Sequence, residues 1–365
     1  MVQNPKYYGP ILIMILFATA NTGSMYMLAG KTLVEATLPS PSHGQKDLWT
    51  ENKFLWIPLY GAQCIENSTD YIAGNYYGNK SIEFRTVQSD RIAFKLQNIG
   101  PVNCSAQDGY TNLYFRVKRI SPNIPPENVS LYLYSLNSSA CLDISREFIH
   151  SAVNVWNNLT IHLASQDWAG NINWTNVTGL MLELTWSQKS NITILVDGLF
   201  FGGVFKPYIE NLTAYMASYA AYSFMQFLLR WVLLGGLIHV LSRVFKARTV
   251  WRVTLVTAGF ALITMFLQAV IGAAAFSTMP NLKYPFELMG GVEGEVENAY
   301  RKISEETWLV NQIYSIAQTV LMVWTVALCA IAVRLTAEVS WTTSILIAFV
   351  AYFAAVLVEG FLLQL

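Results

Sequence analysis

The sequence is poor in charged residues and lacks the short motifs by which many enzymes are recognised. Only 13% of its 365 residues are charged, against about 25% in ordinary soluble domains, and the formal net charge is zero. It has no Gly-x-Ser-x-Gly, phosphate-loop or dinucleotide-binding motif. We therefore expect no enzymatic activity, no cofactor and none of the basic surface that nucleic acid requires.

Histidine and cysteine are also scarce, which restricts the metal sites that the chain can form. None of the four histidines is paired at helical spacing, and the spacing of the four cysteines fits no zinc site. We expect no metal site. Cys64, Cys104 and Cys141 lie in the polar part of the chain, so at most one internal disulfide can form among them. The sequence leaves open whether it forms and which two cysteines it joins.

Long apolar segments, by contrast, are abundant. A membrane-spanning helix needs about 20 mostly apolar residues, and five segments approach this length: residues 9–30, 215–241, 250–276, 308–333 and 342–363. Residues 1–30 contain the first segment and form either a signal anchor or a signal peptide, since Ala18-Thr19-Ala20 has the form of a cleavage site. Apolar residues resume after this motif, which favours the anchor.

Charged residues next to these segments predict how the chain crosses the membrane. The densest basic cluster is Arg243, Lys246, Arg248 and Arg252, and the positive-inside rule places it in the cytoplasm. The acidic loop at residues 281–307 then lies on the opposite side. This orientation exports residues 31–213 to the outside of the cell membrane or, in a eukaryote, to the lumen of an endomembrane organelle.

Motifs for N-glycosylation support the same orientation. Ten Asn-x-Ser/Thr motifs occur, all of them between residues 67 and 211. Their asparagines are Asn67, Asn79, Asn103, Asn128, Asn137, Asn158, Asn173, Asn176, Asn191 and Asn211. We predict these as candidate glycosylation sites, without assuming that each is occupied.

The exported part alternates apolar and polar residues as half-buried strands do. Residues 113–118, 180–186 and 192–197 place apolar side chains at every second position, and turn-rich stretches separate them. Many short strands with such breaks predict a β-sandwich. We therefore expect a multi-domain membrane protein, with an exported all-β sandwich at residues 31–213 and a four-helix transmembrane domain at residues 214–365.

Four stretches of the exported part resemble a known fold. They are residues 156–163, 167–168, 173–180 and 192–201, which are similar to the final strands of galactose-binding-like jelly rolls. Many carbohydrate-binding modules belong to this group. The resemblance implies a jelly-roll sandwich. Some domains of this type bind structural calcium near the position of Asp197, so the resemblance raises this possibility here. One carboxylate, however, cannot supply the six to eight oxygens that calcium prefers.

The same resemblance implies that exposed aromatic rings stack on sugars. The candidates in turn-like stretches are Trp168, Trp174, Tyr76 and Tyr77. The alternative is that these rings fill the interior of the sandwich or cover its edge. The sequence therefore leaves open whether these rings form a glycan site or have a structural role.

The apolar C-terminal part resembles the Yip family of multi-spanning proteins. The similarity is carried by residues 231–243 and 249–261, with Gly235, Gly236 and Gly259, and by residues 323–340. Family members usually have a proline where this chain has Leu262-Ile263-Thr264. Eukaryotic members are tied to vesicle trafficking and small GTPases. An exported β domain is not the usual arrangement of the family, so we do not carry this role over to the chain.

A few polar side chains lie inside the apolar segments, where they are costly and therefore candidates for function. They are Gln226, Arg230, His239 and Glu359. Arg230 is expected to find a polar partner, with Glu359 as one candidate, or else to extend its side chain towards the membrane surface.

The leading functional hypothesis is a non-catalytic membrane protein whose exported domain binds a glycan or a surface protein. Its partners would be the lipid bilayer and that ligand. A single helix would suffice as an anchor, so the number of helices also allows a transporter or channel capped by the β domain.

Overall fold

The computed structural model describes residues 6–40, 44–74, 76–136, 138–149, 151–163 and 167–363. The chain divides into two compact units. One, here called the helical unit, comprises Met1–Leu33, Pro207–Leu282 and Ser304–Leu365. The other, the β unit, comprises Val34–Lys206 and Lys283–Ile303. The β unit therefore includes part of the loop that follows the third apolar segment.

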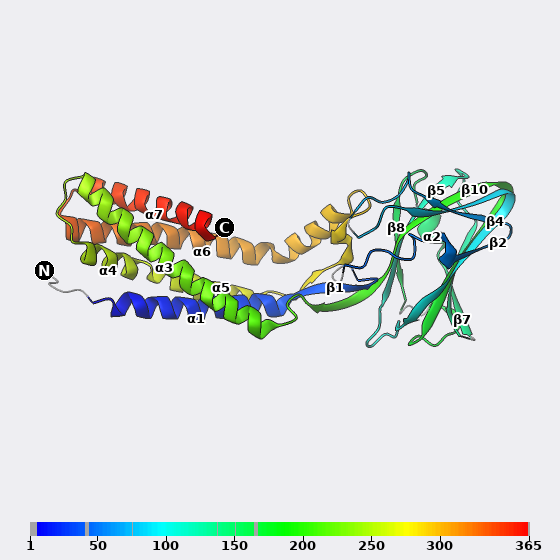
Figure 1. Ribbon diagram of the computed structural model, residues 1–365, viewed down its shortest axis with the longest axis horizontal. Coiled ribbons are helices and arrows are strands. Elements are labelled where there is room, and N and C mark those ends of the chain that lie inside the picture. The colour runs from blue at the N-terminus through cyan, green and yellow to red at the C-terminus, as the bar shows by residue number, and fades with distance from the viewer. Residues whose placement is uncertain are drawn as a thin grey trace. The chain divides into compact units, whose positions relative to one another are not determined.

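The helices of the chain are shown in Figure 1. They are α1 (Tyr8–Lys31), α2 (Ser145–Ile149), α3 (Leu212–Val244), α4 (Trp251–Ala261), α5 (Ile263–Thr278), α6 (Glu295–Ala337) and α7 (Trp341–Leu363), with short 3₁₀ turns at Lys53–Leu55 and Phe286–Met289. Among the described residues, five helices are long and apolar enough to cross a membrane, with α4 and α5 acting as one span. Each of the five apolar segments expected from the sequence overlaps one of these helices.

Specific polar contacts and small residues hold the helical unit together. Asn21 on α1 donates a hydrogen bond to the Ser223 hydroxyl on α3 (3.0 Å), and the indole nitrogen of Trp231 on α3 donates to the Leu255 carbonyl on α4 (2.7 Å). A Cβ atom on Gly235 would lie only 2.7 Å from the Leu255 side chain. Glycine is needed here so that α3 and α4 can approach closely.

Two details of the helices bear on the sequence predictions. The span from Trp251 to Thr278 is interrupted at Leu262, which separates α4 from α5 although no proline is present. Helix α6 begins at Glu295, well before the apolar segment, because Glu295 and Glu297 in its first turn are favourable at the positive end of a helix.

Within the described residues, eleven strands form the sheet of the β unit. They are β1 (Thr32–Leu38), β2 (Trp56–Leu59), β3 (Gln63–Asn67), β4 (Ser81–Val102), β5 (Asn112–Ser121), β6 (Asn128–Ser135), β7 (Ser138–Asp143), β8 (Asn157–His162), β9 (Ala169–Asn171), β10 (Val177–Pro207) and β11 (Leu282–Tyr284). The first and last of these include residues at the border between the two units.

Two long strands, β4 and β10, are shared by both layers of a sandwich. They pair with each other in antiparallel fashion, with register shifts between Thr185 and Ile192. The first half of β10 also pairs with β6, whereas its second half pairs with β5. One layer, sheet I, therefore runs β9-β7-β6-β10-β4-β2, and the other, sheet II, runs β8-β5-β10-β4-β3.

The aromatic core shows that β4 folds back over itself. Phe84 and Phe94 both lie on β4, yet their rings stack with centroids 3.9 Å apart. A straight strand would separate these residues by about 33 Å. Trp56 packs edge-on against both rings. The expected all-β sandwich is confirmed by this geometry.

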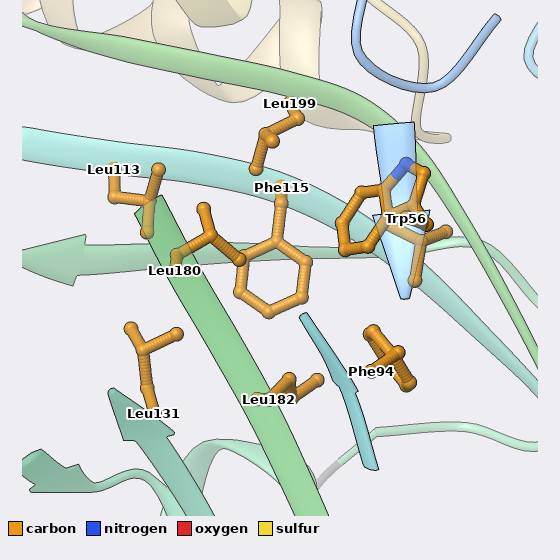
Figure 2. A pocket seen from close by; sticks show the side chains of 9 residues that line it. Trp56, Phe94, Leu113, Phe115, Leu131, Leu180, Leu182 and Leu199 are labelled. Atoms are coloured by element: carbon orange, nitrogen blue, oxygen red, sulfur yellow. The ribbon is translucent and has the colours of Figure 1, made fainter. Parts of the chain in front are cut away.

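The interior of the sandwich is dry and closely packed. Figure 2 shows leucines of sheet I, among them Leu131, Leu180 and Leu182, meeting Leu113 and Phe115 of sheet II. The gap that these apolar side chains leave has a volume of about 10 Å³, roughly one water molecule, and a dry apolar gap of this size does not take up a ligand. This gap therefore has no room for a sugar-sized ligand.

Candidate functional site

The outer face of sheet I carries two tyrosines that the sequence prediction did not single out. On β6, Leu131 and Leu133 are completely buried, whereas the alternating Tyr132 and Tyr134 are partly exposed. This follows from the two-residue period of a strand, which sends successive side chains to opposite faces. The pattern Leu-Tyr-Leu-Tyr at residues 131–134 is the signal that could have revealed this face.

Strand register places polar side chains beside these tyrosines. Tyr132 lies opposite Met181 on β10, and Met181 lies opposite Lys95 on β4. The Lys95 ammonium lies 4.1 Å from the centre of the Tyr134 ring. Glu183 projects from the same face of β10 as Met181, two residues along the strand. We call Tyr132, Tyr134, Lys95, Met181 and Glu183 the tyrosine face.

The electrostatics of this face keep both phenols protonated. Partial burial raises the pKa of Tyr132, and the neighbouring Cys141 thiol raises it further. Partial burial also raises the pKa of Tyr134, with a smaller contribution from the Glu183 carboxylate. At neutral pH the face therefore presents two aromatic rings, one cation and one carboxylate acceptor, and the Tyr134 hydroxyl donates to the Met181 sulfur at 3.6 Å. These groups suit a neutral ligand rich in hydroxyl groups.

The aromatic residues expected from the sequence lie elsewhere. Trp168 and Trp174 form an edge-on pair with ring centroids 5.4 Å apart, and both are partly buried against the core. The Trp168 indole donates a hydrogen bond to the His162 carbonyl. Tyr76 is partly exposed, and it follows a residue outside the described parts of the chain. The structure therefore brings the two tryptophans together next to β9, packed against the core and outside the set of residues that forms the tyrosine face.

The expectation that Tyr77 is an exposed stacking residue is wrong. Its side chain is 1% exposed and packs against Phe200 and Phe286. Its hydroxyl donates to the Gly290 carbonyl, and the Arg116 guanidinium lies 4.9 Å from its ring centre. The alternative that such rings fill the interior holds for this residue.

The neighbourhood of Tyr77 fastens the loop at residues 283–303 to the sandwich. Arg116 is fully buried and forms an ion pair with Glu295 at 2.8 Å. Asn158 donates to the same carboxylate oxygen at 2.8 Å. Glu35 accepts hydrogen bonds from the Tyr114 hydroxyl and the Phe286 backbone. Acidic residues from distant parts of the chain thus have structural roles here.

A buried pair of aspartates is a second feature that sequence reasoning missed. Asp47 and Asp197 are both completely buried, and the Thr50 hydroxyl lies between their carboxylates. Burial raises the pKa of Asp197 to about 8, and the Asp47 carboxylate contributes to this rise. Burial likewise raises the pKa of Asp47 to about 6.

Each oxygen of this aspartate pair already has a donor. Backbone amides of Ile72, Gly198 and Leu199 donate to it, as do those of Trp49 and Thr50. Within the described residues, no group of three or more His, Cys, Asp or Glu side chains could hold a metal ion. Two hydrogen-bonded carboxylates do not fit the calcium suggested at Asp197. The pair ties the loops of the sandwich to β10.

The predicted glycosylation sites differ in accessibility. Exposed asparagines are Asn79, Asn128, Asn173, Asn191 and Asn211, and partly buried ones are Asn67, Asn103, Asn158 and Asn176. The side-chain nitrogens of Asn67 and Asn158 donate to Glu83 and Glu295, so the folded chain does not offer them for modification. Asn137 lies outside the described residues. The four cysteines are free.

The intramembrane polar residues form local pairs. Arg230 on α3 makes a two-pronged ion pair with Glu359 on α7, with one of its hydrogen bonds at 2.8 Å. Glu359, which the sequence offered as one candidate, is therefore the partner of Arg230. His239 lies 3.2 Å from the Thr249 hydroxyl. Gln226 is partly exposed one turn before Arg230.

A comparison with known protein families identifies the family of the chain. The Yip1 domain family model matches residues 150–362, more than half of the chain. The chain belongs to the Yip1 domain family. The resemblance of the C-terminal part to this family is thereby confirmed, and the match also takes in the last strands of the β unit. No curated protein matches the chain.

Among solved structures, the β unit is similar to carbohydrate-binding modules. A family 30 carbohydrate-binding module has 14% identity, a TM-score of 0.31, and coverage of 49% of this chain and 95% of its own. A family 11 module from Clostridium thermocellum with a bound mixed-linked tetrasaccharide has 12% identity and a TM-score of 0.29, and the match covers 46% of this chain and 94% of the module. A β-1,2-glucanase from Parabacteroides distasonis has 13% identity and a TM-score of 0.31, and the match covers 43% of this chain and 24% of the glucanase chain.

Proposed function

We propose that this member of the Yip1 domain family is a non-catalytic membrane protein that binds a glycan through the tyrosine face of its β unit. The observation that carries the proposal is the alternation on β6, which turns Tyr132 and Tyr134 outward beside Lys95 and Glu183. Sugars have apolar faces that pack on aromatic rings and hydroxyl groups that need both donors and acceptors. The tyrosine face offers all of these groups.

The most strongly perturbed acids of the β unit give no support to a catalytic role. Asp47 and Asp197 are the carboxyl pair whose raised pKa values would suit acid catalysis. Both are completely buried and hydrogen-bonded. A glycoside hydrolase needs two carboxyl groups that flank its substrate, and these two cannot reach one.

The proposed orientation places the β unit on the exported side of the membrane. The basic turn between α3 and α4 would lie in the cytoplasm, and the exposed sequons would face the compartment where glycans are added. Helix α1 acts as a retained anchor in this proposal, because Phe17 and Ile13 are buried in the helical core. A cleaved signal would remove these contacts.

Transport is the weaker alternative. A groove of about 350 Å³ lies between α4, α5 and α6, but its lining is mainly apolar, with Phe260, Leu328 and Leu335 among its residues. A path for a polar solute would need polar groups along it. This groove does not favour transport.

The proposal can be tested with the full-length protein in lipid nanodiscs on a glycan array. We expect binding to a defined set of glycans by the wild type and its loss in Tyr132→Ala/Tyr134→Ala. Trp168→Ala/Trp174→Ala is the matched control, since it removes two aromatic rings of the same unit outside the tyrosine face. Loss of binding in the tryptophan variant alone would move the site to the residues first expected from the sequence.

Binding of surface proteins but of no glycan would contradict the ligand class. In that case the tyrosine face would be a protein interface. A folding check by circular dichroism accompanies both variants, because a misfolded β unit would lose either kind of binding.

A further inference from the structure

The turn between α3 and α4 forms a basic hollow in the helical unit. Its volume is about 390 Å³, and it is lined by Arg243, Lys246, Ala247, Arg248, Thr249 and Val250. The three basic side chains are exposed. Within the described residues, none of them forms an ion pair. The hollow therefore carries uncompensated positive charge.

The backbone of this turn is ordered by hydrogen bonds. The Ala247 amide donates to the Ser242 carbonyl at 3.0 Å, and the Lys246 amide donates to the Arg243 carbonyl at 3.0 Å. Lys246 adopts a positive φ of 59°. Together these features form a Schellman motif, which ends many helices. The basic side chains thus project from a defined framework.

The start of α4 adds to the positive potential. The residue that precedes the helix, Val250, cannot cap it with a side-chain hydrogen bond. The first amides of an α-helix lack partners within the helix and carry a partial positive charge. An anion in the hollow would face both this helix end and the basic side chains, which is the arrangement that favours phosphate.

The surroundings of the hollow point to a lipid as the source of that phosphate. Val244 and Val250 are 68% and 64% exposed, and the ring of Trp251 is 45% exposed. Apolar side chains next to basic ones suit the boundary between headgroups and acyl chains, and tryptophan is enriched there. A site for free phosphate would have no need of these exposed apolar residues.

An apolar groove lies in the same half of the helical unit. It is the groove of about 350 Å³ between α4, α5 and α6. Thr257, on its wall, is six residues beyond Trp251, hence about 9 Å deeper along α4. Leu335 and Thr336, on the opposite wall, lie at the end of α6. The α3–α4 and α6–α7 turns are at the same end of the helices (Figure 1).

We propose that the hollow binds the phosphate of an anionic phospholipid, whose acyl chain lies along the apolar groove. The basic turn recognises the headgroup and the groove recognises the chain. This site is independent of the tyrosine face, and its failure would leave the proposed glycan binding untouched.

The test uses full-length protein in a nonionic detergent and lipids with a fluorescent acyl chain. We expect phosphatidylglycerol to bind more tightly than phosphatidylcholine. Each basic residue near an anionic surface contributes roughly fivefold, so Arg243→Gln/Arg248→Gln should weaken phosphatidylglycerol binding about 25-fold. The matched control is Arg301→Gln/Lys302→Gln, which removes the same charge from exposed positions of the β unit and should bind as the wild type does.

Three results would overturn the proposal. Equal binding of the two lipids would remove the role of the headgroup charge. Equal loss in the two variants would show a general charge effect. Displacement of phosphatidylglycerol by millimolar inorganic phosphate would show that the hollow is a site for free phosphate. Arg243→Lys/Arg248→Lys should restore most of the binding, which separates loss of charge from loss of fold.

Discussion

The ion pair between Arg230 and Glu359 offers a sharp test of how the helical unit is held together. Glu359 is 2% exposed as a residue, and its carboxylate meets the guanidinium with two hydrogen bonds. Arginine cannot lose its charge in a protein. Glu359→Leu therefore leaves a charged guanidinium without its partner inside an apolar segment.

Two independent estimates give the size of this effect. Removing one partner of a buried ion pair costs about 3–5 kcal/mol, and an arginine at the centre of a membrane helix costs roughly 2.5–3.5 kcal/mol on insertion scales. Because the Arg230 side chain is 15% exposed, we expect the lower end, about 3 kcal/mol. Arg230→Leu/Glu359→Leu removes both charges and should be within about 1 kcal/mol of the wild type.

The assay is reversible unfolding of the helical unit in mixed micelles, with all four members of the double-mutant cycle. A suitable control is Glu66→Gln, which breaks the partly exposed pair between Glu66 and Lys80 of the β unit at 2.8 Å and should leave the unfolding of the helical unit unchanged. The reasoning is refuted if Glu359→Leu is as stable as the wild type, or if the two single changes simply add.

Three further predictions concern other parts of the chain. The pKa of Asp197 in the folded protein is raised above its ordinary value, so the folded state keeps a proton that the unfolded state releases, and the stability of the β unit should fall as the pH rises from about 4 to 8. In Asp197→Asn the thermal melting temperature should depend less on pH across this range, and an unchanged pH dependence would contradict the raised pKa of Asp197. Phe84→Ala should destabilise the β unit by about 3–5 kcal/mol in chemical unfolding, since it removes a fully buried ring of the core, and a loss below about 1 kcal/mol would argue against the stacked core. Cysteine labels at residue 246 should react from the cytoplasmic side only and those at residue 293 from the other side only; access to both from one side would refute the proposed orientation.

Periodicity and composition were enough to predict the apolar helices and the β-sandwich class of the exported part. Membrane helices are long and uniformly apolar, and the alternation in residues 180–186 survives as a buried and a partly exposed face of β10. The partner of Arg230 could also be named from composition, because Glu359 is an acidic residue inside an apolar segment. Helix α3 begins at Leu212 and is 33 residues long, which places Arg230 about 21 Å from the C-terminal end of the helix at Val244. Arg230 on α3 can therefore lie at the same depth as Glu359 on α7.

Contacts between distant segments could not be predicted in this way. Asp47 and Asp197 are about 150 residues apart in the chain, and only the folding of loops onto β10 brings their carboxylates together. Glu295 looked like one of several acidic loop residues, yet it is paired with the buried Arg116. Tyr77 was assigned to the surface because turn-like sequence surrounds it, although the loop at residues 283–303 covers its ring.

The central claim is that the tyrosine face, and not the tryptophan pair, is the ligand site of the β unit. Its most direct test is a calorimetric titration of a glycan selected on the array into the full-length wild type, Tyr132→Ala/Tyr134→Ala and Trp168→Ala/Trp174→Ala. Aromatic contacts contribute about 0.5–1.5 kcal/mol each, so the tyrosine variant should bind at least roughly fivefold more weakly, while the tryptophan variant keeps the wild-type affinity. Unchanged affinity in the tyrosine variant would contradict the account.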